Sequence, residues 1–398
     1  MKKNLFILAV AGLALASCSN DETVNSLATS GASEISFNSF MSGVTRASAN
    51  GPMSNFADGD QINVYASYYN GTADVKYFQD DFTKQAGSTG FTSTQKHYWP
   101  DMADPKKMTF TAIYGATQST TTVGEITSYS PATAVADQKD VLVARHVSDD
   151  KETPVPMNFR HALSQIVLKV KNDNPSLRIT IKAFQIGYVD KTGTFQLDRT
   201  STTSIPNTDT PEAAADGNTG SITTNVTLLP ATKWSNTAAT APTSNYIQTL
   251  TSDKVFNGTN TSEVATLGSA WLLLPQTKTA GTDYVNSTAN VTVDANTEPN
   301  LNNAYFAVKM VIDSYNGSEV TASLATERWC CWPVALTWNP GYKYTYTINL
   351  GDGGYQPADV DGTAGLDPVL GDAIVFSPTC TIDAWVVSDS NVPAAPQP

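Results

Sequence analysis

Strict alternation of apolar and polar residues between Tyr342 and Leu350 most constrains the fold of this chain. Every second residue in this stretch is tyrosine, isoleucine or leucine, and the residues between them are lysine, threonine or asparagine. Successive side chains of a strand point to opposite faces, whereas a helix would distribute these apolar residues around its circumference. The pattern predicts a strand with one buried face, entered through a turn at Trp338–Gly341.

The same period of two recurs along most of the chain. It begins with Ile35 and Phe37, and Gly, Asp and Pro punctuate the short segments that follow. Further strands are expected at 62–65, 108–114, 141–144, 155–159, 166–170, 177–181, 195–197, 222–229, 271–274, 291–293 and 305–312. Almost no stretch keeps helical periodicity for three turns. The sequence predicts an all-β protein built from β-sandwiches.

Length and charge restrict the classes of function. The chain has 398 residues, only 15% of them charged, and a net charge of −13. A chain of this length has room for two or three domains. Nucleic acid and anionic membrane surfaces would repel a protein with this charge, so neither is an expected partner.

The first 18 residues indicate export and lipidation. Lys2 and Lys3 precede an apolar run that ends in Leu15-Ala16-Ser17-Cys18. The run is too short for a comfortable membrane span, and its small last residues fit a signal peptide. A cysteine at the cleavage point resembles the bacterial lipobox, in which the thiol is acylated. We therefore expect a signal peptide over 1–17, lipid on Cys18, and a polar tether over 18–32.

Three further cysteines leave two readings open. Cys330 and Cys331 are adjacent, and their mutual disulfide would be strained. Either could bridge to Cys380, since the cell envelope permits disulfides. Equally, the cysteines could be small buried apolar residues within strands.

No motif points to catalysis. The three histidines are not arranged in a zinc or hydrolase motif, and no phosphate-binding glycine loop occurs. His161 lies close to Ser164 in sequence, but a structural hydrogen bond explains this histidine better than a catalytic role. The acidic loop from Asp352 to Asp367 lacks the spacing of a calcium loop, although adventitious calcium there is an alternative to a solvated connector. We expect neither an enzyme nor a metal or other cofactor.

Arg46 is the only basic residue between Lys3 and Lys76. It lies in the small, polar sequence Gly43-Val44-Thr45-Arg46-Ala47-Ser48, directly after the first expected strand. Proteases require accessible segments of this composition. The sequence therefore favours proteolytic processing between Arg46 and Ala47.

An ordered set of short motifs resembles the Bacteroidales fimbrillin family, the subunits of type V pili. The set begins with the lipobox and continues with Ile35-Ser36-Phe37, Thr45-Arg46-Ala47, Phe56–Val64, Tyr98-Trp99-Pro100, Phe110-Thr111-Ala112, Phe159–Ser164, Leu274-Pro275-Gln276, Trp338–Tyr344 and Ile382-Asp383-Ala384-Trp385. The resemblance implies two transthyretin-like β-sandwich domains in tandem, here 33–158 and 159–398. It also implies a cell-surface fimbrial subunit of the outer membrane with a role in cell adhesion.

The resemblance further implies how such subunits assemble. An arginine-specific protease would cut after Arg46 and release the strand carrying Ile35, Phe37 and Phe40, within residues 33–46. The groove left behind would take a donor strand from the next subunit, head to tail. The donor in this chain would be 374–387, carrying Ile374, Phe376, Ile382 and Trp385.

Two alternative functions are compatible with the sequence. A surface glycan-binding lipoprotein would stack host or bacterial sugars on exposed aromatic residues, here Trp234, Trp329, Trp332 and Trp338. A non-polymerising tip or anchor subunit would share the fold without donating a strand. The Pro-rich tail from Asn391 to Pro398 keeps this second alternative open.

Overall fold

The computed structural model describes residues 33–40, 53, 55–69, 74–100, 108–148, 151, 154–197, 233–239, 245–258, 263–283, 298–323, 326–357, 366–370 and 379–384. These residues form strands joined by turns and short 3-10 segments such as Val135–Asp137 (η2) and Leu350–Asp352 (η5). The all-β prediction is confirmed. Within the described residues, no helix has the length and apolar character needed to cross a membrane. The expected strands at 222–229 and 291–293 lie outside these residues.

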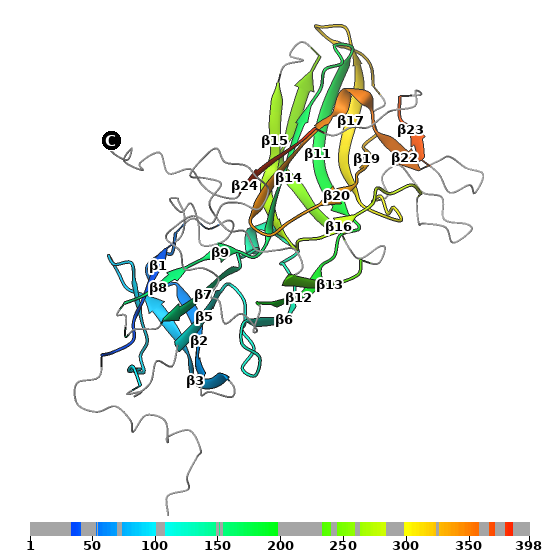
Figure 1. Ribbon diagram of the computed structural model, residues 1–398. Helices are drawn as coiled ribbons and strands as arrows, with labels where there is room; N and C mark the ends of the chain where they lie inside the picture. Colours follow the sequence, from blue (N-terminus) through cyan, green and yellow to red (C-terminus); the bar gives the residue numbers. More distant parts are fainter. Residues whose placement is uncertain are drawn as a thin grey trace, which may run out of the picture.

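An eight-stranded sheet contains the first part of the chain (Figure 1, blue to green). Its strands, in spatial order, are β8 (Val155–Asn158), β1 (Phe37–Phe40), β4 (Gly90–Thr92), β3 (Asp74–Lys84), β2 (Gln61–Tyr69), β5 (Met108–Tyr114), β7 (Leu142–Ser148) and β9 (Arg160–His161). The two end strands, β8 and β9, follow each other in the chain, and β7 also contacts β8. The sheet therefore curls around one core, which contains many of the phenylalanines of this region.

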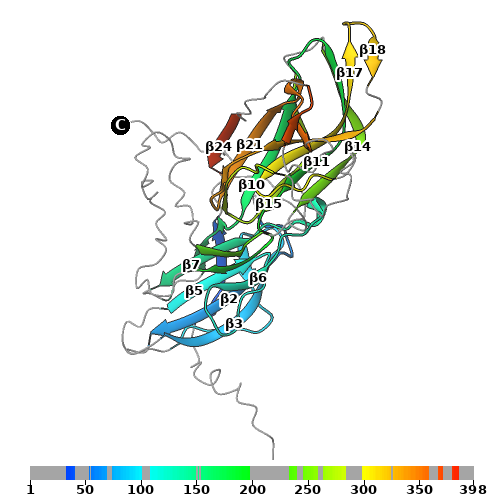
Figure 2. The same cartoon turned by 90° about the vertical axis from the view of Figure 1, so that its right-hand side faces the viewer.

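Two sheets, one of four strands and one of seven, face each other in the second part of the chain. The four-stranded sheet has the order β15 (Val264–Leu273), β10 (Ser164–Lys171), β21 (Tyr342–Asn349) and β24 (Thr379–Ala384). The other sheet has the order β14 (Tyr246–Asn257), β11 (Leu177–Gly187), β17 (Tyr305–Tyr315), β19 (Arg328–Pro333), β22 (Tyr355–Pro357) and β23 (Leu366–Pro368), with β18 (Val320–Ser323) paired to β17. Figure 2 shows the β17–β18 hairpin extending from one end of this sandwich.

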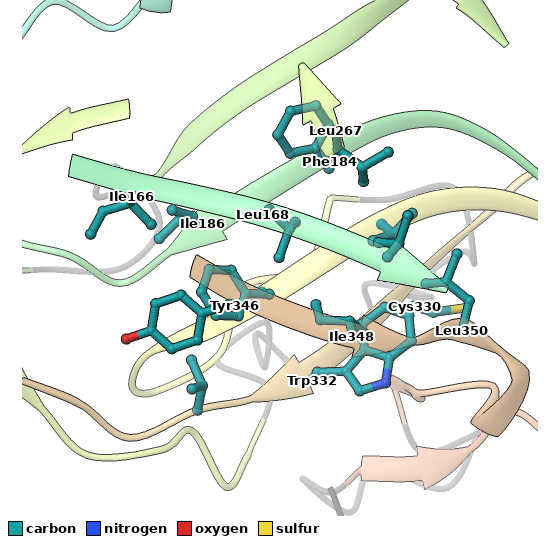
Figure 3. Close-up of a cluster of buried hydrophobic side chains, with 14 of the residues drawn as sticks. Ile166, Leu168, Phe184, Ile186, Leu267, Cys330, Trp332, Tyr346, Ile348 and Leu350 are labelled. Atoms are coloured by element: carbon teal, nitrogen blue, oxygen red, sulfur yellow. The ribbon is translucent and has the colours of Figure 1, made fainter. Parts of the chain in front are cut away.

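Alternation accounts for the core between these two sheets. Ile166 and Leu168 of β10 and Tyr346 and Ile348 of β21 point inward, toward residues such as Trp332 from the opposite sheet (Figure 3). The Lys and Thr residues between them on β21 are only partly buried. The predicted face of the Tyr342–Leu350 strand is therefore the buried one. Its parallel pairing with β10 places it in the interior of the sheet.

A small sheet connects the two parts of the molecule. Strand β6 (Glu125–Tyr129), from the first part, pairs with β12 (Thr192–Gln196), which pairs with β13 (Trp234–Thr237). Strands β16 (Thr277–Lys278) and β20 (Leu336–Thr337) form a separate two-stranded sheet. The small sheet contributes to a separate apolar cluster that draws residues from both parts, including Ile126 and Phe195. The two parts are thus joined by paired strands as well as by the chain.

Candidate functional site

Strand β1 lies inside its sheet, with a hydrogen-bonded neighbour on each side. It pairs antiparallel with β4 through Phe37↔Phe91, and parallel with β8 from Phe37↔Val155 onward. The amide of Val155 donates to the carbonyl of Ser36 at 2.7 Å, and the amide of Ser39 donates to Thr89 O at 3.3 Å. Loss of β1 would therefore leave two open sheet edges rather than one.

Apolar side chains fix β1 in the core. Phe37 has no exposed surface, and its ring meets Phe82 at 4.7 Å and Phe110 at 5.2 Å between ring centroids, both edge to face. Ile35 is also buried and belongs to the same cluster. The side chain of Phe40, the third residue predicted to be displaced with this strand, lies outside the described residues. Ile35, just before β1, and Phe37, its first residue, therefore fill two apolar sites of this core.

Polar interactions extend the contact beyond β1 toward the N-terminus. The amide of Ile35 donates to His97 O at 2.7 Å, and the amide of Trp99 donates to Ser33 O at 3.0 Å. Glu34 forms an exposed ion pair with Lys96 at 2.8 Å, which raises the pKa of that lysine. Hydrogen bonds therefore hold the whole segment 33–40. Its first residues bond to 97–99, and β1 bonds to β4 and β8.

The chain is anchored again at Met53. Its amide donates to Asp140 Oδ2 at 2.9 Å, and its side chain is buried. The same oxygen of Asp140 lies 2.8 Å from His161 Nδ1, and Asp140 itself is fully buried. The predicted processing residues Arg46 and Ala47 lie between β1 and Met53, outside the described residues. Anchors on both sides of this interval mean that a cut there would leave Met53 bonded to Asp140.

A glycine allows the chain to pass close to Asp140. Gly115 has a φ of +78°, and a Cβ at this position would lie 1.9 Å from the carbonyl oxygen of Asp140. No other residue fits so close to backbone, and few adopt that conformation without strain. Gly115 therefore helps to hold the segment that positions the Asp140 carboxylate.

Strand β24 is the described part of the predicted donor segment. It pairs antiparallel with β21, with Ile382 opposite Tyr344, and it forms the end of the four-stranded sheet (Figure 2). Ile374, Phe376 and Trp385 lie outside the described residues, as does the side chain of Ile382. As an edge strand, β24 can leave its sheet by breaking one ladder of hydrogen bonds instead of two.

Among the described residues, no cysteine forms a disulfide bond. Cys330 and Cys331 follow each other on β19, so they point to opposite faces of the sheet and join different apolar clusters. Cys380 lies on β24 opposite Tyr346 and is exposed. Of the two readings, small buried apolar residues describe Cys330 and Cys331, and the bridge to Cys380 is not formed. Cys18 lies outside the described residues.

The tryptophans considered for glycan binding are buried. Trp234 and Trp329 are 7% and 4% exposed, and Trp332 and Trp338 are fully buried. Among the described residues, the exposed large apolar side chains are Val264, Val320 and Leu370, none of them aromatic. These four tryptophans therefore form no exposed stacking surface.

His161 and Ser164 do not form a catalytic pair. His161 bonds to Asp140, whereas the Ser164 hydroxyl donates to Asn339 O at 2.8 Å. Within the described residues, no group of three or more His, Cys, Asp or Glu side chains could hold a metal ion.

Sequence reasoning identified Ile35 and Phe37 but not the groups around them. Asp140, His161 and Met53 come from three distant parts of the sequence, and no local motif marks their contact. Two signals were available: His161, for which the sequence predicted a structural hydrogen bond, and Asp140, an acidic residue directly before the apolar run Val141–Ala144. A carboxylate at the start of a buried strand requires partners.

The sequence profile of the fimbrillin-like family matches residues 45–385 of the chain. No curated protein matches it in sequence. Among solved structures, one described as a cell adhesion protein from Bacteroides ovatus is 15% identical, covering 90% of this chain and 100% of its own, with a TM-score of 0.45. A fimbrial protein from Bacteroides vulgatus is also 15% identical, covering 81% of this chain and 92% of its own, with a TM-score of 0.38. Because the family profile spans most of its length, the chain belongs to the fimbrillin-like family.

Proposed function

We propose that this protein is a structural subunit of a cell-surface fimbria with a role in cell adhesion. The subunits of this fimbria assemble head to tail by strand exchange. Proteolysis after Arg46 triggers the exchange. Membership of the fimbrillin-like family supports the fimbrial role. The observation that carries the mechanism is the place of β1, a short strand inserted between the end strand β8 and β4, which is followed closely by the predicted cleavage residue.

Cleavage after Arg46 removes the covalent link between β1 and the rest of the domain. The strand is then held only by its hydrogen bonds and by the burial of Ile35 and Phe37. Its departure opens an apolar groove between β8 and β4. Backbone groups on both edges of this groove can pair with a strand from another subunit, which contributes main-chain hydrogen bonds while its alternate side chains fill the apolar sites.

Each subunit has a groove near one end of its chain and a donor strand near the other. The contact between subunits is therefore heterologous and does not close on itself, so repeated exchange produces a filament. The partners are other fimbrial subunits, and the precursor is held at the outer membrane by lipid on Cys18.

Treatment of lipid-free protein with an arginine-specific protease tests the mechanism. The Cys18→Ala protein provides this material, and light scattering with gel analysis follows its size. We expect a monomer before treatment and a ladder of oligomers afterwards. An Arg46→Ala variant, or deletion of the residues after Gly371, should remain monomeric. Complete cleavage after Arg46 without oligomers would contradict strand exchange.

Lipid anchoring has its own test. In native cells, Cys18→Ala should move the protein from the membrane fraction to the soluble fraction, because the thiol is the acceptor of the diacylglyceryl group. Mass spectrometry of the wild-type N-terminus should show the lipid. A variant that still carries lipid and partitions with membranes would contradict this part of the proposal.

A further inference from the structure

The tripeptide pattern Ile-x-Phe occurs at two places in this sequence. One is Ile35-Ser36-Phe37, which leads into β1 and ends at its first residue, and the other is Ile374-Val375-Phe376. The first copy fills the two apolar sites beside β4 and β8, where both side chains are buried. The second lies outside the described residues, between β23 and β24.

We propose that this repeat fixes the register of subunit exchange, with Ile374 and Phe376 of one copy occupying the sites of Ile35 and Phe37 in the next. The proposal rests on the strand-exchange function proposed above and adds which residues recognise each other. The occupant is a second copy of this chain. A segment with the same side chains at the same spacing fills both sites without a change in strand direction.

The backbone of the second copy can make most of the same hydrogen bonds. In the proposed register, the amide of Ile374 replaces that of Ile35 as donor to His97 O. The carbonyl of Val375 replaces that of Ser36 as acceptor for the amide of Val155. The carbonyl of Asp372 likewise replaces that of Ser33, which accepts from Trp99. None of these positions requires a group that the second copy lacks.

Two interactions are lost in the exchange. Pro378 takes the place of Ser39 and has no amide hydrogen for Thr89 O, so pairing on this side ends at Ser377. Ala373 takes the place of Glu34, so the ion pair with Lys96 is absent. The incoming strand is thus a slightly poorer ligand for the groove than β1.

Cleavage after Arg46 therefore controls whether the donor strand can replace β1 in the groove. While β1 is covalently attached, its effective concentration at the groove is far higher than that of any neighbour, and it also makes the better contacts. After cleavage it is diluted into solution when it dissociates, whereas the donor strand remains part of a subunit. Exchange therefore depends on the cut, even though the groove prefers β1.

A disulfide between two copies tests the register. Asn38 lies opposite Gly90 on β4, so in the proposed register Ser377 of the neighbour faces Gly90. One copy carries Gly90→Cys and the other Ser377→Cys, both in a Cys18→Ala, Cys380→Ser background that removes lipid and the exposed thiol. The matched control carries Ala373→Cys, which lies four residues away on the same face of the donor strand. All proteins are cleaved with the arginine-specific protease before mild oxidation.

We expect cross-linked dimers with Ser377→Cys and none with Ala373→Cys. Filaments that form without the Ser377 cross-link, or with the Ala373 cross-link instead, would overturn the register and leave the fimbrial function standing. If no filaments form in any mixture or in the wild type, the register and the proposed function fail together.

A second variant series tests the side chain. Phe376→Ala should slow oligomer growth at least about tenfold, because the site of Phe37 would be left unfilled. Phe376→Leu should restore part of the rate, and Val375→Thr, on the opposite face, should leave it nearly unchanged. Equal rates for all three variants would contradict the proposal.

Discussion

Phe37 is the residue whose burial holds the first strand in place. Its ring has no exposed surface and packs edge to face against Phe82 and Phe110. Replacing it with alanine would leave a cavity between two rigid rings. In the uncleaved protein, we expect Phe37→Ala to lower the free energy of unfolding by about 3–5 kcal/mol.

Chemical denaturation measures this effect, with Asn38→Ala as the control because Asn38 is adjacent on β1 but points to the other face. A loss below about 1 kcal/mol for Phe37→Ala would show that the site collapses easily. In that case burial of the strand would not explain the stability of the precursor.

Asp140 joins two segments through one buried carboxylate oxygen. That oxygen accepts from the amide of Met53 and contacts His161 Nδ1. Asp140→Asn preserves the size of the side chain but removes its negative charge. We expect it to lower the free energy of unfolding by about 1–3 kcal/mol, as for other weakened buried hydrogen bonds. Asp137→Asn, at an exposed position of the 3-10 segment η2, is the control. Equal stabilities of the two variants in thermal unfolding would show that the Asp140 carboxylate does not stabilise the contacts with Met53 and His161.

The cysteines differ in access and in ionisation. Burial raises the pKa of the Cys330 thiol strongly and that of the Cys380 thiol to a smaller extent. A raised pKa leaves less of the reactive thiolate at neutral pH. In the native Cys18→Ala protein, we expect a maleimide to label Cys380 alone, and more slowly than a free thiol in a peptide. Peptide mapping checks this, and labelling of Cys330 without denaturant would contradict the described packing.

At the scale of elements, alternation predicted the strands whose two faces differ in exposure. Strands β5, β10 and β21 each keep apolar residues on a buried face, and all three were expected from the sequence. Strand β14 was not expected. Most of its residues are exposed or half-buried, and its centre, Thr249–Lys254, is largely polar, so it has no apolar face to detect.

The pairing of β1 could not be predicted from the sequence either. Its alternation identifies Ile35 and Phe37 as buried, but the two neighbours come from 90–92 and 155–158. Nothing local in those segments specifies the partner. Pairing of distant strands depends on the arrangement of the whole sheet, and periodicity carries no information about it. The burial of Ile35 and Phe37 was therefore predictable, whereas the two-sided pairing of β1 and the contacts of Asp140 with Met53 and His161 were not.

At the scale of the whole molecule, the junction between the two parts is bonded as a unit. Trp234 Nε1 donates to Ala162 O at 2.6 Å, and the amide of Leu272 donates to Gln138 Oε1 at 2.7 Å. Ile126 and Phe195 pack in the same apolar cluster. We expect the wild-type protein to unfold in a single calorimetric transition, because neither part can open without breaking this junction.

A double variant tests this coupling. Trp234→Phe with Gln138→Ala removes both hydrogen bonds and keeps most of the apolar contact. The two parts should then melt in separate transitions, with the first at a lower temperature. Gln248→Ala, on the surface between β14 and β15, is the control. A single transition for the double variant would mean that these two hydrogen bonds are not what couples the two parts, and that β6–β12 pairing and the retained apolar cluster are sufficient.

The parallel pairing of β1 with β8 also has a consequence for how the chain folds. Phe37 and Val155 are far apart in sequence, and their alignment closes the loop that contains almost all of the first sheet. Contacts of such high contact order carry a large loop-closure entropy and form late. Strand β1 is therefore expected to dock last, into a sheet whose other members have already assembled. The newly synthesised protein would then pass through an intermediate with an open gap at β1, so the receptive state that we propose for the cleaved subunit would be one that the chain has already visited during folding.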